Sequence, residues 1–212
     1  MIEKMSNVHI EGMVRTRLDA FSNSFLSRLG PEVLRILYEE VCSSDHFCGY
    51  VYLNNSNQVC GFIFASLADG SSFNRQVIRK RWDVLSFFII KRFLYHPRLS
   101  VEIFRRLMSL LKDSLKGFLG SRSGIQNREG SPVSAGIPGV MLTPEYHGKG
   151  IAKELIQALL KDLKDKDIKE VCLSTGVDNM GANRFYQKMG FELIDTYIEY
   201  GGIKQNRYRL CL

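Results

Sequence analysis

The chain of 212 residues contains no cysteine grouping that predicts a metal site or a disulfide framework. Its five cysteines are scattered and odd in number, and no Cys-x-x-Cys or His/Cys cluster occurs; they are Cys42, Cys48, Cys60, Cys172 and Cys211. Scattered free thiols are typical of proteins from a reducing compartment. We therefore expect no metal and a cytoplasmic location.

Long apolar runs and an N-terminal targeting pattern are absent as well. The run Val84–Ile90 is far shorter than the roughly 20 residues needed to cross a bilayer. The residues up to Asn7 contain no apolar core of a signal peptide. Hydrophobic content of 45% and charged content of 24% are ordinary for a soluble globular protein. The length predicts a single domain over residues 1–212.

Two common phosphate-binding loops are also missing. A Walker loop needs Gly, four residues and then Gly-Lys-Ser/Thr, and no such run occurs. A dinucleotide fingerprint would need Gly or Ala at the position of Lys153 and an acidic residue after the next strand. That strand leads instead into Gly176-Val177, so the sequence supports both loop types only weakly.

A glycine-containing turn is the first feature that indicates a site. Ser134–Leu142 predicts an apolar strand, interrupted by glycine and proline, and a helix with one apolar face begins at Ile151. Between them lie Gly148, Lys149 and Gly150. Free N–H groups at a helix N-terminus bind anions, and glycine lets a phosphate approach the backbone closely. A turn that merely begins a helix would explain this segment equally well.

A second motif follows the strand predicted over Lys169–Thr175. Asp178 or Asn179 can cap the next helix, and Gly190 is typical of a helix C-terminus. The helix positions that share one face are Ala182, Phe185, Tyr186 and Met189. We interpret Phe185 as a core aromatic. For Tyr186, core packing is the alternative to the functional role that the order of elements favours.

Together these motifs resemble the acyl-CoA-binding half of the GNAT superfamily of N-acyltransferases. The family pattern at the turn is Gln or Arg, two residues, Gly, one residue, then Gly or Ala, and His147–Ala152 departs from it only in its first residue. The second family pattern is matched at Asn179, Ala182, Phe185, Tyr186, Gly190 and Phe191. The resemblance implies an α/β (α+β) fold with a mixed, largely antiparallel sheet flanked by helices.

The resemblance also implies direct transfer of an acetyl group from acetyl-CoA to an amine. The backbone near Leu142 would pair with the pantetheine arm, and amides from Gly148 to Ala152 would hold the pyrophosphate. Tyr186 would protonate the departing thiolate as general acid, a step worth about 10²–10⁴-fold. The implied donor-binding positions are Leu142, Thr143, His147, Gly148, Lys149, Gly150, Ile151, Ala152 and Asn179.

The remaining segments fit the acceptor side of such a domain. Asn7–Phe21 suggests a strand running into a helix, and Gly30-Pro31 begins a second helix. His46–Leu53 and Val59–Leu67 predict two strands. A helical insertion over about residues 70–133, with helices near Val77–Leu94 and Leu99–Leu119, precedes the fourth strand.

The net charge of +7 is unevenly distributed. Arg75–Arg128 holds 13 basic and three acidic residues, so the rest of the chain is slightly acidic. A basic block can recognise nucleic acid, anionic lipid or an anionic substrate. Since the aromatics within the block sit in apolar runs, we expect no nucleic acid and favour a small-molecule amine with an anionic group, such as an amino-sugar.

Several alternatives stay open. One is a basic module that docks on nucleic acid or membrane and retains a CoA-binding fold. Peripheral contact with an anionic membrane is suggested by Trp82 beside basic residues, and the protein could be a monomer or a homodimer. The general base is not identified, because Ser134–Leu142 holds no carboxylate. Glu145 is better explained as a solvated surface residue, Asp69 as a turn residue and His147 as part of the cofactor loop, and a water chain is a further alternative.

Overall fold

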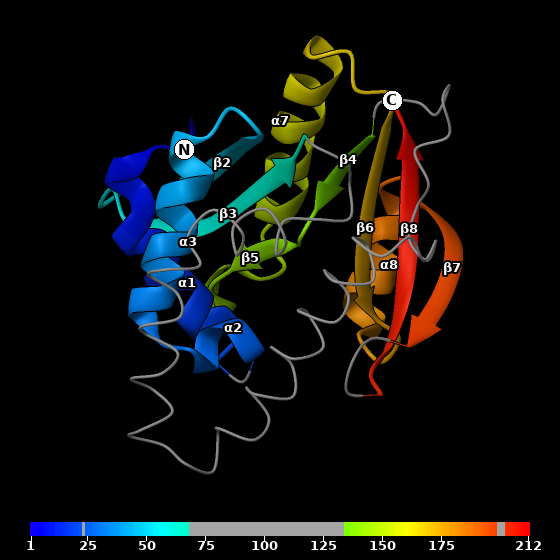
Figure 1. Cartoon of the computed structure of the whole chain (residues 1–212), viewed down its shortest axis with the longest axis horizontal. Coiled ribbons are helices and arrows are strands. Elements are labelled where there is room, and N and C mark those ends of the chain that lie inside the picture. Colours follow the sequence, from blue (N-terminus) through cyan, green and yellow to red (C-terminus); the bar gives the residue numbers. More distant parts are fainter. Residues whose placement is uncertain (23, 68–133, 199–201) are drawn as a thin grey trace, which may run out of the picture.

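A mixed sheet of eight strands forms the frame of the protein (Figure 1). The computed structural model describes residues 1–22, 24–67, 134–198 and 202–212. The strands are β1 (Ile2–Lys4), β2 (Phe47–Leu53), β3 (Val59–Ser66), β4 (Ser134–Ile137), β5 (Val140–Leu142), β6 (Glu170–Gly176), β7 (Glu192–Ile198) and β8 (Lys204–Cys211). Their order is β1-β2-β3-β4-β6-β8-β7, with β5 also paired to β3. Among the described strands only β4 and β6 pair in parallel, which confirms the largely antiparallel sheet.

Helices cover both faces of this sheet. The helices are α1 (Ile10–Ala20), α2 (Phe25–Arg28), α3 (Pro31–Ser43), α7 (Ile151–Asp165) and α8 (Met180–Lys188), with short 3-10 turns η1 (Asn7–His9) and η2 (Pro144–Tyr146). Apolar residues of α1 and α3 pack on one face, against Phe62 and Phe64 of β3. Those of α7 and α8 pack on the opposite face, with Ile63 and Ala65. The alternation of β3 side chains between two cores explains why this strand is buried on both sides.

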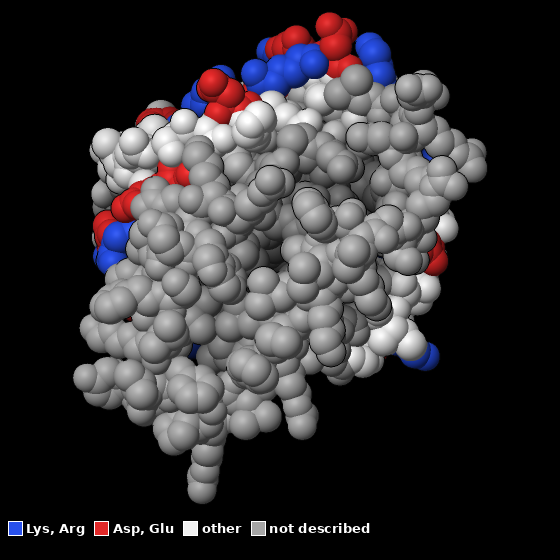
Figure 2. Space-filling model, in the orientation of Figure 1, with Lys and Arg blue, Asp and Glu red and all other residues white. Residues whose placement is uncertain are grey.

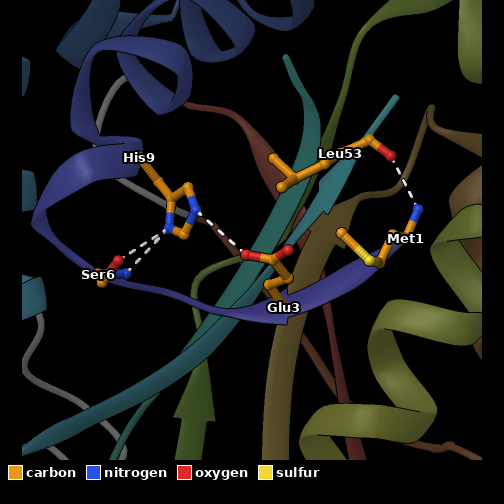
Figure 3. Close-up of polar contacts among 5 residues, drawn as sticks. All are labelled: Met1, Glu3, Ser6, His9 and Leu53. Carbon is orange, nitrogen blue, oxygen red and sulfur yellow. Dashed lines mark hydrogen bonds and ion pairs between the residues drawn. The ribbon is translucent and has the colours of Figure 1, made fainter. Parts of the chain in front are cut away.

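The start of the chain differs from the expected strand within Asn7–Phe21. The strand is β1, which ends at Lys4, and residues from Asn7 onward are helical. Figure 3 shows why the chain turns here: the backbone N–H and hydroxyl of Ser6 donate to Nδ1 of His9 at 3.2 and 3.1 Å. Nε2 of His9 then faces Glu3 at 3.7 Å, and the Met1 amine donates to the Leu53 carbonyl at 2.8 Å.

The strand predicted over Ser134–Leu142 is interrupted as its sequence suggests. Residues 138 and 139 separate β4 from β5, and Gly139 has a φ of +147° that favours glycine. Before the break, residues 134–137 pair in parallel with residues 170–173 of β6. After it, β5 pairs with β3, and residues 174–176 of β6 keep only the pairing with β8 that runs along the whole strand on its other edge. Beyond the break β5 and β6 are therefore not paired with each other, and among the described residues no strand lies between them.

The other elements from Gly30 onward begin and end close to their predicted bounds. The inserted helices, Asp69, Trp82 and the basic block Arg75–Arg128 lie outside the described residues. In Figure 2 the described charges visible on this face include both signs and lie along the rim of the view, with a group at the top over the end of α7 and another at the left edge. None of the helices in the described ranges is long and apolar enough to cross a bilayer.

Candidate functional site

The turn before α7 presents a row of free backbone N–H groups. Gly148 and Gly150 have φ values of +73° and +83°, a left-handed conformation that L side chains rarely adopt. Within the described part of the chain, the N–H groups from Gly148 to Ala152 have no hydrogen-bond partner. A Cβ added at either glycine would meet no atom within 4 Å. The turn is therefore an open, amide-lined surface at the positive end of the α7 dipole, and it can accept an anion.

The side chain of His147 connects this turn to the end of β5. Its Nε2 lies 3.1 Å from the carbonyl oxygen of Leu142, so Nε2 carries the proton and donates it. The N–H of Thr143 donates to the carbonyl of Cys60 at 2.9 Å, on the β3 side. Backbone groups alternate in direction along a strand, so the N–H of Leu142 points away from β3, toward the side where β5 and β6 part.

These contacts refine two of the predicted donor-binding positions. The Leu142 carbonyl is already occupied by His147, which leaves the Leu142 N–H as the group that can meet a ligand. The Thr143 hydroxyl also donates to the Cys60 carbonyl, at 3.2 Å. Thr143 thus holds the turn on β3, and its hydroxyl is turned toward the protein.

Lys149 contributes a positive charge whose position is defined by an aromatic ring. Its Nζ lies 4.9 Å from the centroid of the Tyr146 ring, within cation–π distance. Tyr146 in turn packs on Tyr52 of β2, with centroids 6.2 Å apart. The ammonium group is therefore kept close to the turn by a ring that is itself supported by the sheet.

Helix α8 begins at Asn179, on the β6 side of the site. The Asn179 Oδ1 accepts a hydrogen bond from the N–H of Ala182 at 3.1 Å, as its predicted capping role requires. Its amide oxygen is thus engaged in the fold, while its Nδ2 has no partner in the described ranges. A ligand that used this residue would accept a hydrogen bond from Nδ2.

Tyr186 is more deeply buried than the sequence suggests. It is 6% exposed, whereas its neighbour Phe185 is half-buried. Its ring packs on those of Phe185, Phe191 and Tyr208, with centroids 5.5, 5.8 and 6.1 Å apart. No described residue forms a hydrogen bond with its hydroxyl. Burial raises the pKa of Tyr186 to about 12, so the phenol stays protonated at neutral pH.

Asn183 is a buried polar residue that the sequence motif does not single out. Its Nδ2 donates to the carbonyls of Gly176, Val177 and Asn179 at 2.9, 3.2 and 2.7 Å. Its Oδ1 accepts hydrogen bonds from Asn206 and Tyr208 of β8 at 2.9 and 2.8 Å. At 7% exposure, Asn183 fixes the turn from β6 to α8 that carries Asn179. An Asn in place of an apolar residue on the inner face of α8 is the signal that could have revealed it.

The predicted residues lie on both sides of the point where the strands part. Leu142 and the turn from His147 to Ala152 belong to β5 and α7, and Asn179 and Tyr186 belong to α8, which follows β6. Both groups contribute to the core on the same face of the sheet. Among the described residues no general base is identified: Glu145 and His147 are exposed, and no group of His, Cys, Asp and Glu in the same ranges could hold a metal ion.

Comparison with known proteins gives consistent results. Residues 104–191 match the family model described as "Acetyltransferase (GNAT) family". A mycothiol acetyltransferase of Paenarthrobacter aurescens is 40% identical over 67 residues, 32% of this chain and 21% of that protein. N-alpha-acetyltransferase 30 of Schizosaccharomyces pombe is 39% identical over 62 residues, 29% of this chain and 41% of that protein. The chain therefore spans less than half the length of these relatives.

A solved structure extends the likeness to the whole fold. Arabidopsis thaliana NAA60 in complex with acetyl-CoA superimposes with a TM-score of 0.60, covering 100% of this chain and 98% of that one. At 13% sequence identity, this likeness concerns the arrangement of elements alone.

Proposed function

This chain is a member of the GNAT superfamily, and we propose that it transfers an acetyl group from acetyl-CoA directly to an amine. The observation that supports this most is the parting of β5 from β6 beside the amide-lined turn of α7. A strand edge, free N–H groups and a helix N-terminus are together suited to a long, phosphate-bearing donor. The matching relatives are named as acetyltransferases, and NAA60 carries acetyl-CoA on a similar fold.

In this proposal each part of acetyl-CoA is bound by a specific group of the protein. The N–H groups from Gly148 to Ala152 bind the pyrophosphate, and Lys149 adds a positive charge beside them. The N–H of Leu142 faces the pantetheine arm and the thioester carbonyl, whose polarisation favours attack. Asn179 donates from Nδ2, since its Oδ1 caps α8.

Tyr186 is the proposed general acid. The amine nitrogen forms a bond to the carbonyl carbon, the carbon–sulfur bond breaks, and Tyr186 protonates the departing thiolate. A pKa near 12 keeps this proton in place until the thiolate develops. The same burial disfavours a phenolate, so Tyr186 must regain a proton within each cycle. The attacking amine releases one proton as it becomes an amide, which balances the proton that Tyr186 gives to the thiolate.

Asn183 is the proposed positioning residue of the β6 side. It contacts no reacting atom in this scheme, but it sets the turn that presents Asn179 and begins α8. Because α8 also carries Tyr186, a shift of this turn would move both groups together.

For the acceptor, we propose a small amine that bears an anionic group, such as an amino-sugar. The support is the excess of basic residues over Arg75–Arg128 in the sequence. The relatives carry different names, mycothiol acetyltransferase and N-alpha-acetyltransferase 30, so their names point to no single acceptor.

Turnover with a panel of amines tests the proposal. Release of CoA from acetyl-CoA would be followed with amino-sugars, peptides with free N-termini, polyamines and aminoglycosides. We expect amine-dependent release with at least one class, and CoA binding by calorimetry. A folded protein that binds neither CoA nor acetyl-CoA would refute the acyltransferase function.

A further inference from the structure

Arg17, near the end of α1, has an unusual environment for an arginine. Its side chain is half-buried, and its Nε is buried without a hydrogen-bond partner in the described part of the chain. Its described partners are all uncharged: Nη2 donates to the Ser24 hydroxyl at 3.3 Å, and the guanidinium lies 5.3 Å from the centroid of the Phe21 ring. A guanidinium withdrawn from water without an anion is unfavourable.

Other described arginines differ in this respect. Arg35 pairs with Glu11, Arg207 with Asp195 and Arg209 with Glu170. These pairs lie on exposed or half-exposed surfaces, where pairing is least needed. Arg17 has a buried Nε without an acceptor, and no carboxylate among the described residues pairs with its guanidinium. An external anion would supply both the acceptor and the opposite charge.

Three hydroxyl groups belong to the cluster around Arg17. The Ser24 and Ser27 hydroxyls lie 2.9 Å apart, and Ser27 is 6% exposed. The phenol of Tyr38 is the third: burial raises its pKa to about 12, and the nearby charge of Arg17 lowers it in part. The Ser24 oxygen accepts from Arg17 and from the N–H of Ser27, so it holds the guanidinium in place. The planar guanidinium and the Tyr38 phenol are the donors that match the oxygens of a carboxylate or phosphate.

This cluster lies over the strand that carries the proposed acyl-donor contacts. Thr16, adjacent to Arg17, donates to the Val59 carbonyl at 2.9 Å, and α1 packs on both β3 and β5. Tyr38 packs edge-on against Phe62, with centroids 5.3 Å apart, and Phe62 is paired with Met141 of β5. The cluster thus sits on the face of the sheet opposite α7 and α8, the face that α1 and α3 cover (Figure 1).

We infer that Arg17, with the phenol of Tyr38 beside it, binds an oxyanion group of the acyl acceptor. This inference rests on the proposed acyltransferase function and adds the group that selects its substrate. The oxyanion is a phosphate or a carboxylate, and both bind such a fork by charge-assisted hydrogen bonds.

Matched pairs of amines test the inference. Glucosamine 6-phosphate is compared with glucosamine, and glycylglycine with its neutral amide, by calorimetry on the CoA-saturated protein and by turnover. We expect the anionic member of one pair to be preferred by about tenfold or more, as charged hydrogen bonds imply. The pair that shows the preference identifies phosphate or carboxylate.

Three variants assign the preference to Arg17. Arg17→Met should reduce it to less than about threefold, and Arg17→Lys, which keeps the charge without the fork, should give an intermediate value. Arg15→Met, an exposed change on the same helix, should keep it. If Arg17→Met does not fold, Arg17→Lys decides. A preference that survives in the folded Arg17 variant, or no preference in either pair, overturns the inference.

The two measurements separate this inference from the proposed function. Selective binding of the anionic amine without any turnover would leave the Arg17 site standing and count against the acyltransferase. Turnover without an Arg17-dependent preference would support the acyltransferase function and overturn the Arg17 site.

Discussion

At the scale of single residues, the backbone conformation at position 150 restricts which side chains the site can carry. Gly150 caps α7 with a φ of +83° and faces open space. A side chain there would meet no neighbouring atom of the protein. It would therefore have two effects: backbone strain of about 1–2 kcal/mol and contact with a ligand bound to the turn.

Replacing Gly150 by Asp or Asn separates these two effects. Both side chains have nearly the same shape and tolerate the left-handed region better than most, but Asp adds a negative charge where the pyrophosphate is proposed to bind. We expect Gly150→Asp to weaken CoA binding by at least about tenfold relative to Gly150→Asn, measured by calorimetry. Equal affinities in the two folded variants would exclude an anion at this turn.

Tyr186 allows a second test at this scale. Tyr186→Phe keeps the packed ring and removes a hydroxyl with no described partner, so stability should hardly change. Turnover should fall about 10²-fold if proton transfer limits the rate, with CoA affinity retained. Since the pKa is raised to about 12, deprotonation of Tyr186 should not reduce the native rate until the pH approaches that value.

Tyr208→Phe is the matched control for this change. Its hydroxyl donates to Asn183 at 2.8 Å, so its loss should lower the free energy of unfolding by about 1 kcal/mol. Turnover should stay close to native, because the ring against Tyr186 is kept. An unaltered rate in Tyr186→Phe, in an assay limited by chemistry, would leave Tyr186 with a packing role alone.

At the scale of elements, the turn between β6 and α8 depends on one side chain. Asn183 links three carbonyls of this turn to β8, and it lies one helical turn before Tyr186 on the inner face of α8. The geometry of Asn179 and of the helix start therefore depends on Asn183 rather than on the turn sequence itself.

Asn183→Ala should affect both stability and donor binding. Three carbonyls lose a buried donor, so unfolding should become easier by about 2–4 kcal/mol. A displaced turn should also raise the KM for acetyl-CoA by about tenfold, with little change in the KM for the amine. Thr16→Val, which removes a buried hydrogen bond on the other face of the sheet, is the control. If the two variants lose stability and the KM for acetyl-CoA rises in neither, Asn183 is structural only.

At the scale of the whole molecule, two cores on opposite faces of one sheet connect the site to the fold. Leu155 of α7 is fully buried beneath the strands, near Gly61 of β3 and Leu142 of β5. The same helix begins at the amide-lined turn, so its packing determines where that turn lies relative to β5.

Leu155→Ala should therefore destabilise the protein as a unit. The change creates a cavity under α7 and should lower the free energy of unfolding by about 2–5 kcal/mol, measured by denaturant titration. Gln157→Ala, on the exposed side of the same helix, should change it by less than about 0.5 kcal/mol. Comparable effects of the two changes would contradict the packing of α7 on the sheet.

The sequence alone determined the features that depend on neighbouring residues. The order of the described elements after Gly30, the break at residues 138–139, a cap at Asp178 or Asn179 and the glycine turn all follow from periodicity and turn chemistry within short segments. The strand expected within Asn7–Phe21 was wrong, because strand formation requires a partner. That partner is β2, which pairs instead with Ile2–Lys4.

Only the tertiary structure decided burial and long-range contacts. The depth of Tyr186, the hydrogen bonds of Asn183 to β8, the contact between His147 and Leu142, and the uncharged surroundings of Arg17 all depend on which elements meet. A sequence pattern specifies which face of a helix or strand is apolar. It does not specify which polar group from another element lies opposite, and that pairing decides what each site residue can do.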